Sequence, residues 1–184
     1  MVKTRILICS ALLLLFVGMV YAQEKGEAVN PSPAELDAVK ELNKATNLML
    51  KGEYKEAIEF LKKAIELNPE LSEAYYNLGI SYEHLGKHKD AIEVLEKSIK
   101  LSPDDPNAYY ALGYAYYQKK KYQKAIDAFE HTVSLQPNNA FAFKKLGSSY
   151  LKVGKKDKAH EQQKILEKLD RQLGEELYRE IIND

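Results

Sequence analysis

The sequence predicts an all-α solenoid, in which units of two helices stack on one another along the chain. The first observation is a period of 34 residues that four residue types keep. These residues are Ala57, Ala91, Ala125 and Ala159; Pro69, Pro103 and Pro137; Gly79, Gly113 and Gly147; and Tyr82, Tyr116 and Tyr150. The second observation is that apolar residues within each period follow helical spacing, and the third is that Gly or Pro separates the helical runs. A fixed period of this length indicates supersecondary units that bury their apolar faces against their neighbours.

The chain starts with the layout of a secretory signal. Lys3 and Arg5 precede the uncharged residues 6–22, which end in the small residue Ala22. We therefore expect cleavage after Ala22, so that residues 1–22 are a signal peptide. The alternative is an uncleaved inner-membrane anchor, although a helix of this length spans roughly 25 Å and a bilayer core is about 30 Å thick.

A flexible tether is expected over residues 23–33, which hold two prolines and few large apolar residues. The only cysteine, Cys9, lies in the predicted signal, so no intramolecular disulfide can form. The signal layout and the balanced charge favour an exported chain, with a bacterial periplasm as the expected location.

One repeat domain is expected over residues 34–184. Its four units are predicted at about residues 38–71, 72–105, 106–139 and 140–173. In the second unit, Tyr75, Leu78 and Tyr82 fall on one face of a first helix, and Ala91 and Leu95 fall on one face of a second helix. Each unit is therefore expected to read helix, short turn, helix, longer turn.

Turn residues mark the ends of these helices. Gly86 separates the two helical runs of the second unit and can take the left-handed conformation that ends many helices. Pro103 stops the second helix, and Asp104 or Asp105 can cap the helix that follows. No proline stands at the corresponding position of the fourth unit, Arg171, so its second helix is expected to continue.

A capping helix is expected at about residues 174–182. Leu173, Leu177 and Ile181 form a further apolar stripe there, flanked by charged residues. Such a helix would cover the exposed apolar face of the last unit.

The units resemble the tetratricopeptide repeat (TPR), of an exported bacterial type. The residues that carry the resemblance in the second unit are Tyr75, Leu78, Gly79, Tyr82, Ala91, Leu95 and Pro103. The third and fourth units keep this pattern, whereas the first unit has Ala45 and Leu48 where the others have Gly and Tyr. The resemblance covers about residues 38–173 and implies a right-handed α-solenoid with the capping helix at its end.

Small residues and aromatic residues have separate roles in this pattern. Helices approach within about 8–10 Å only where small side chains lie at the crossing, which the repeated Gly and Ala residues supply. Tyr75, Tyr109 and Phe143 are expected to fill the space between adjacent units.

The resemblance also implies a concave groove lined by the first helix of each unit. The partner-binding residues expected there are Tyr76, Ile80, Tyr110, Tyr114, Tyr117, Lys144 and Leu151. The first unit contributes Val39, Leu42, Thr46, Met49 and Leu50 to the same face. Helical spacing supports the groove independently, because Tyr110, Tyr114 and Tyr117 form a second aromatic stripe in the third unit. Tyrosines offer large contact area with a polar tip. Alternatively, these tyrosines pack on one another or on the tether.

Some members of this family clamp a C-terminal carboxylate with Lys, Asn and Arg residues. Of the positions that would carry this clamp, only Asn77 matches here. The others hold Leu42, Thr46, Asn107 and Ala111. The clamp is therefore not expected.

Other function classes find little support. The chain has 27 basic and 27 acidic residues, which argues against a nucleic-acid binder that works by bulk positive charge. His84 and His88 lie four residues apart, but Gly86 separates them, so no metal site is expected. Lys119, Lys120 and Lys121 are expected in a solvated turn. No phosphate-binding, dinucleotide or hydrolase motif is present, so neither enzymatic activity nor a cofactor is expected.

The sequence thus predicts a non-enzymatic scaffold for protein–protein interaction. Its concave groove would bind a peptide or helix of a partner protein, in a setting such as envelope, secretion or pilus assembly. Nucleic acid is not expected as a partner, and a membrane only through an uncleaved signal. The alternative is a structural homo-oligomer that stacks through Leu42, Met49 and Leu50, which the first unit is expected to expose.

Overall fold

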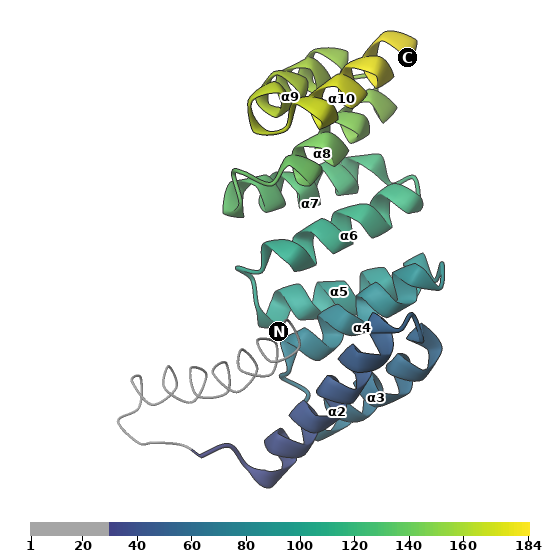
Figure 1. The fold of residues 1–184 in the computed structure, drawn as a ribbon, viewed down its shortest axis with the longest axis vertical. Coiled ribbons are helices and arrows are strands. Elements are labelled where there is room, and N and C mark those ends of the chain that lie inside the picture. The colour runs from purple at the N-terminus through teal and green to yellow at the C-terminus, as the bar shows by residue number, and fades with distance from the viewer. Residues whose placement is uncertain (1–29) are drawn as a thin grey trace, which may run out of the picture.

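The computed structural model describes residues 30–184, which form nine α-helices and no β-strand (Figure 1). The helices are α2 (Pro33–Leu50), α3 (Tyr54–Leu67), α4 (Ser72–His84), α5 (His88–Leu101), α6 (Pro106–Gln118), α7 (Tyr122–Leu135), α8 (Ala140–Lys152), α9 (Lys156–Leu169) and α10 (Arg171–Asn183). The predicted signal peptide, residues 1–22, lies outside the described residues, as does most of the predicted tether. No helix within residues 30–184 has the length and hydropathy needed to cross a bilayer.

Consecutive helices form pairs, and the pairs stack in chain order. Helix α2 packs on α3, α4 on α5, α6 on α7 and α8 on α9, and the second helix of each pair contacts the first helix of the next pair. Figure 1 shows the resulting elongated stack, with α2 and α10 at opposite ends. This arrangement confirms the predicted all-α solenoid of helix–turn–helix units.

The first helix starts within the segment predicted as tether. Ser32 Oγ accepts a hydrogen bond from the backbone N–H of Glu35, and Glu35 Oε2 accepts one from the backbone N–H of Ser32 at 2.6 Å. Pro33 follows at a position where a helix needs no N–H donor. The bond from the Ser32 backbone N–H stabilises the Glu35 carboxylate, so the pKa of Glu35 is lowered. Helix α2 therefore begins at Pro33.

One residue in the short turn of each unit takes the left-handed backbone conformation. Gly52, Gly86 and Gly154 have φ of +80°, +70° and +73°, and Lys120 takes the equivalent position of the third unit with φ of +57°. In each unit, the next backbone N–H bonds to the carbonyl oxygen five residues earlier, as Lys121 N–H does to Tyr116 at 2.9 Å. This is the Schellman ending that Gly86 predicted.

Side chains cap the helices that follow the longer turns. Of the two candidate aspartates, Asp105 accepts a hydrogen bond from the backbone N–H of Asn107 at 2.9 Å. Asn139 accepts one from the backbone N–H of Ala142 at 3.0 Å. Each cap satisfies a donor that the helix itself leaves free.

Close helix crossings explain the repeated glycines. A Cβ placed on Gly113 would lie 2.7 Å from Cε1 of Phe129, which is fully buried. A Cβ on Gly79 would lie 2.5 Å from Cγ of Leu95. The first and second helices of these units therefore approach too closely for any larger residue.

The repeated tyrosines tie adjacent units together. Tyr116 Oη donates a hydrogen bond to Glu96 Oε1 at 2.5 Å, and Tyr150 Oη donates to Glu130 Oε1 at 2.5 Å. Burial and the Glu96 carboxylate raise the pKa of Tyr116 to about 12. Of the three aromatic residues expected between units, Phe143 is buried, whereas Tyr75 and Tyr109 are only half-buried.

The C-terminal end differs from its prediction in one respect. Helix α9 does not continue past Arg171 but ends at Leu169, because Asp170 has extended backbone and caps α10 by accepting from the N–H of Leu173 at 3.1 Å. A side-chain cap here ends one helix and starts the next without a proline. Helix α10 therefore starts at Arg171, three residues before the expected capping helix, and buries Leu177 and Ile181 completely.

Candidate functional site

The first helices of the units lie side by side. Helix α2 contacts α4, α4 contacts α6, α6 contacts α8, and α8 contacts α10. Six of the seven predicted partner-binding residues lie on α4, α6 and α8. Five of them pack against the main apolar cluster, and the sixth, Leu151, belongs to it. The six are Tyr76, Ile80, Tyr110, Tyr114, Tyr117 and Leu151. The seventh, Lys144, lies on α8. We call these seven residues the first-helix stripe.

The tyrosines of the stripe are half-buried. Tyr110 packs its ring at 5.7 Å from the ring of Phe129, and Tyr117 packs edge-on at 5.3 Å from the ring of Tyr122. Their inner faces therefore complete the core, while part of each side chain stays accessible. The rings rest on core residues beneath them, so packing and an accessible binding surface coexist at these positions.

Burial sets the ionisation of these tyrosines. The pKa of Tyr76 is raised by burial and by the charge of Asp105. The pKa of Tyr110 is raised by burial and by Tyr114, and that of Tyr117 by burial, Glu180 and Tyr122. All three phenols are neutral at physiological pH and keep a hydroxyl group that can donate or accept a hydrogen bond.

Lys145, which was not predicted to bind a partner, lies beside the tyrosines of the first-helix stripe. Lys145 Nζ lies 5.4 Å from the ring centroid of Tyr114 and 5.6 Å from that of Tyr117. Among residues 30–184, no carboxylate oxygen lies within 4.0 Å of this ammonium group. Its pKa is lowered by burial and by Lys144, an effect that Glu180 partly opposes. Lys145 lies four residues after Phe141, which is 64% exposed on α8, so helical spacing could have placed Lys145 on the same face.

Lys144, which was predicted to bind a partner, already has intramolecular partners. Its Nζ lies 2.8 Å from Glu180 Oε1 and 3.5 Å from Glu176 Oε2, and its side chain is 15% exposed. Ser148 Oγ donates to the other oxygen of Glu180 at 2.6 Å. Helix α10 thus places a carboxylate on the stripe, which the apolar pattern of this helix did not reveal.

A hollow of about 230 Å³ lies where the stripe meets α10. Its lining consists of Tyr117, Ser148, Leu151, Lys152, Glu180, Asn183 and Asp184. Leu151 is only 5% exposed, so it forms the floor of the hollow and does not project from the stripe.

The first unit does not present the apolar surface that was expected. Leu42 is 4% exposed and belongs to the core, because α2 packs it against α3 and α4. Met49 is half-buried against the same cluster, and only Leu50, at 78%, is fully exposed. The expectation of an exposed Leu42 was therefore wrong.

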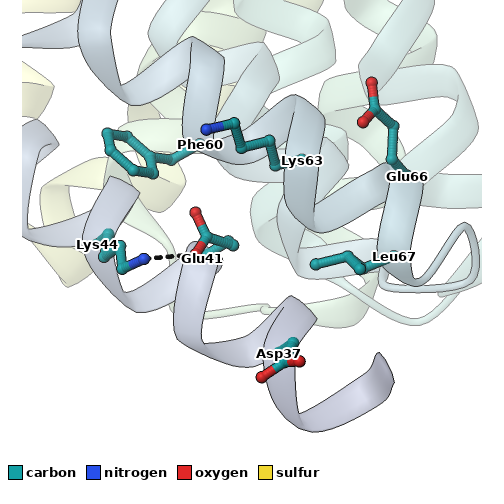
Figure 2. Close-up of a pocket in the computed structure, with 7 residues that line it drawn as sticks. All are labelled: Asp37, Glu41, Lys44, Phe60, Lys63, Glu66 and Leu67. Atoms are coloured by element: carbon teal, nitrogen blue, oxygen red, sulfur yellow. Dashed lines mark hydrogen bonds and ion pairs between the residues drawn. The ribbon is translucent and has the colours of Figure 1, made fainter. Parts of the chain in front are cut away.

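A second hollow, of about 480 Å³, lies between α2 and α3 at this end of the stack (Figure 2). Its lining consists of Asp37, Glu41, Lys44, Phe60, Lys63, Glu66 and Leu67. Charged side chains dominate this surface, in contrast to the aromatic stripe.

The histidines pack in separate contacts. His84 stacks on Tyr54 with ring centroids 4.0 Å apart, and His88 Nδ1 lies 2.9 Å from Glu83 Oε1. Within residues 30–184, no three His, Cys, Asp or Glu side chains are close enough together to hold a metal ion.

Comparisons with known proteins agree with this architecture. The family model described as TPR repeat matches residues 48–86 and 84–120, and the model described as tetratricopeptide repeat matches residues 106–139. None of the curated proteins compared with the chain matches it.

Three solved structures illustrate the likeness. The crystal structure of MamA is 33% identical, with a TM-score of 0.70 over 74% of this chain and 80% of that chain. MamA from Desulfovibrio magneticus RS-1 is 27% identical, with a TM-score of 0.69 over 74% of this chain and 77% of that chain. YrrB, described as a TPR protein with an unusual peptide-binding site, is 24% identical, with a TM-score of 0.69 over 83% of this chain and 74% of that chain. The chain belongs to the tetratricopeptide repeat family and is a non-catalytic scaffold protein.

Proposed function

We propose that the scaffold binds an extended segment or a helix of a partner protein along the first-helix stripe. The observation that carries this proposal is the aromatic surface of the third unit, where the accessible parts of Tyr110, Tyr114 and Tyr117 adjoin the ammonium group of Lys145. Aromatic side chains beside a cation are typical of residues that dominate binding energy.

The charge of Lys145 narrows the chemistry of the partner. This half-buried cation faces two ring surfaces, and no carboxylate oxygen of residues 30–184 lies within 4.0 Å of it. A partner with an acidic side chain would supply the missing charge. YrrB, which shares the fold, has a peptide-binding site according to its description.

A peptide selection tests the stripe. Random 12-residue peptides displayed on phage are selected on residues 23–184, which contain every described helix, and enriched peptides are titrated by fluorescence anisotropy. The variant Tyr110→Ala/Tyr114→Ala/Tyr117→Ala is expected to weaken binding by at least about tenfold, since buried aromatic anchors carry most of the affinity. Enriched peptides that bind this variant as well as the parent would refute the proposal.

Two further variants sharpen the result. Lys145→Met keeps most of the side-chain volume but removes the charge, and it is expected to weaken only peptides with an acidic residue. Tyr178→Ala, at a 48% exposed tyrosine on α10 outside the stripe, is the matched control and is expected to leave binding unchanged. Circular dichroism confirms that each variant keeps the helicity of the parent.

We further propose that the scaffold works after export, in the assembly of envelope, secretion or pilus complexes. The basic start and apolar residues 6–22 support export, and a bacterial periplasm is the proposed location. Expression of the full chain in a bacterial host, followed by fractionation and N-terminal sequencing, tests this proposal. A periplasmic product that begins at Gln23 is expected, whereas a product that starts at Met1 in the cytoplasm would refute it.

A further inference from the structure

The short turns of the third and fourth units concentrate positive charge. Residues 118–124 and 152–158 together hold eight lysines and a single acidic residue, Asp157. All eight lysines are exposed, and none of their ammonium groups lies within 4.0 Å of a carboxylate oxygen of residues 30–184. They are Lys119, Lys120, Lys121, Lys124, Lys152, Lys155, Lys156 and Lys158. No ion pair of the described residues therefore neutralises these two turns.

The two turns lie next to each other at one edge of the stack. Each unit is a helical hairpin and the units stack in chain order, so the short turns lie at one edge and the long turns at the other. A hydrogen bond connects the two turns directly, since Lys155 Nζ donates to Gln123 Oε1 at 3.4 Å. Lys124 Nζ and Lys158 Nζ lie 5.3 Å and 5.2 Å from the ring centroids of the repeated tyrosines of their units. The eight lysines thus form one patch, which we call the basic edge.

The balanced net charge of the chain conceals this separation of charge. At the opposite edge, residues 66–73 and 102–107 form the first two long turns and hold five acidic residues and no basic residue. They are Glu66, Glu70, Glu73, Asp104 and Asp105. An anionic surface attracts the basic edge and repels the opposite edge, so it would orient the solenoid as well as hold it.

We propose that the basic edge binds the anionic headgroups of a lipid membrane. A cluster of about four to eight basic residues is typical of proteins that bind anionic lipids. The lysine ammonium is a hydrated point charge on a flexible stem, which suits a fluid layer of headgroups. Nucleic-acid sites add arginine forks or exposed aromatic rings. The two turns hold no arginine, and Tyr122, their one aromatic residue, packs its ring 5.3 Å from that of Tyr117.

The number of lysines sets the expected strength of binding. Each lysine near an anionic surface favours binding about fivefold. If half of the basic edge approaches the headgroups together, binding to anionic vesicles exceeds binding to neutral vesicles by roughly several hundredfold. Because the attraction acts through water, about 0.5 M salt, which shortens the screening length to a few ångströms, is expected to weaken binding by at least about tenfold.

Vesicle co-sedimentation of residues 23–184 tests the proposal. This part of the chain contains every described helix and lacks the apolar residues 6–22, which could bind lipid by themselves. Vesicles of phosphatidylcholine alone are compared with vesicles that contain about 30% phosphatidylglycerol, at about 50 mM and about 0.5 M salt. We expect binding to the anionic vesicles at low salt only. A parent that does not bind them, or that binds neutral vesicles equally well, would overturn the proposal.

A matched pair of variants locates the contact. The edge variant is Lys119→Gln/Lys121→Gln/Lys155→Gln/Lys156→Gln, and it is expected to lose at least about tenfold in affinity. The control variant, Lys62→Gln/Lys100→Gln/Lys164→Gln/Lys168→Gln, removes the same charge from exposed lysines in the later turns of α3, α5 and α9. It is expected to stay within about threefold of the parent. Equal losses by the two variants would show that net charge alone acts, which contradicts the proposal.

Soluble polyanions separate a membrane from other anionic partners. Labelled poly-glutamate represents an acidic protein and a labelled single-stranded oligonucleotide represents a nucleic acid, and each is titrated by fluorescence anisotropy. Tighter binding of either one than of the anionic vesicles, per negative charge, would also overturn the proposal. None of the substituted lysines belongs to the first-helix stripe, so lipid binding and the proposed peptide binding fail or succeed independently.

Discussion

Lys120 is the one non-glycine residue at a position that every unit holds in the left-handed conformation. Its φ is +57°, and the equivalent residues Gly52, Gly86 and Gly154 have φ between +70° and +80°. A Cβ at these three glycines would meet no atom within 4 Å. A side chain at this position therefore affects stability through the backbone conformation alone. Lys120→Gly tests the energetic cost of that conformation.

The expected change in the free energy of unfolding follows from two opposing effects. A left-handed L residue costs about 1–2 kcal/mol, which Gly avoids. Gly loses about 0.5–1 kcal/mol more backbone entropy on folding. Lys120→Gly is therefore expected to raise the free energy of unfolding by about 0.5–1 kcal/mol, which corresponds to a rise in Tm of about 1–4 °C for a chain of this size.

Thermal unfolding followed by circular dichroism, with urea unfolding as a second measure, checks this expectation. The reciprocal variant Gly86→Lys places a side chain in the same conformation one unit earlier and is expected to lower stability by a similar amount. A shift of the urea midpoint without a change in slope would show that stability itself changed. A Tm for Lys120→Gly that equals or falls below that of the parent would refute the reasoning.

Three further predictions concern the packing of the solenoid. Gly113→Ala should destabilise the chain by about 1–2 kcal/mol in urea unfolding, because the 2.7 Å contact with Phe129 outweighs the gain of about 1 kcal/mol in helix propensity, and a stabilised variant would contradict the close crossing. Tyr116→Phe should cost about 1 kcal/mol near neutral pH. Because folding raises the pKa of Tyr116 to about 12, its contribution is complete below pH 10 and is lost between pH 10 and about 12, so the difference between parent and variant should shrink over that range in pH-dependent unfolding. Asp170→Ala should cost about 1 kcal/mol and speed amide hydrogen exchange at the start of α10, and unchanged exchange there would argue against the cap.

The architecture could be predicted because its determinants recur within the chain. Gly79, Gly113 and Gly147 recur at a spacing of 34 residues, as do Pro69, Pro103 and Pro137, so the period itself supported each unit boundary. The end of α9 was mispredicted because the proline signal is absent after it. Asp170 nevertheless takes the extended conformation that Asn68, Ser102 and Gln136 take at the equivalent positions, and its side chain also caps α10.

The stripe was harder to predict because burial depends on neighbouring helices. Leu42 and Leu151 stand at groove positions of the repeat, yet both are at most 5% exposed, since packing across neighbouring helices covers them. Lys144 appeared free in the sequence but is engaged by Glu180 from a helix 36 residues away. Helical spacing places a side chain on a face and cannot tell what another helix brings to that face.

The internal repeat also separates residues that pack from residues that are free to serve function. Where packing decides, the units agree, as Gly79, Gly113 and Gly147 do. Each lies where another helix approaches closely, with Leu177 of α10 as the neighbour of Gly147. On the stripe they differ, although the surrounding backbone is the same. The corresponding residues of units two, three and four are Tyr76, Tyr110 and Lys144; Ile80, Tyr114 and Ser148; and Glu83, Tyr117 and Leu151.

Repeated packing therefore cannot account for the choice of residue on the stripe. In the fourth unit, Lys144 and Ser148 are explained by α10, because Glu180 accepts hydrogen bonds from both. In the third unit, Tyr110, Tyr114 and Tyr117 hold all three of these positions. Their rings contact core residues and Lys145, and part of each side chain stays accessible. Because packing would be satisfied by smaller or aliphatic residues there, as Ile80 shows one unit earlier, the third unit is where a partner has the most surface to recognise.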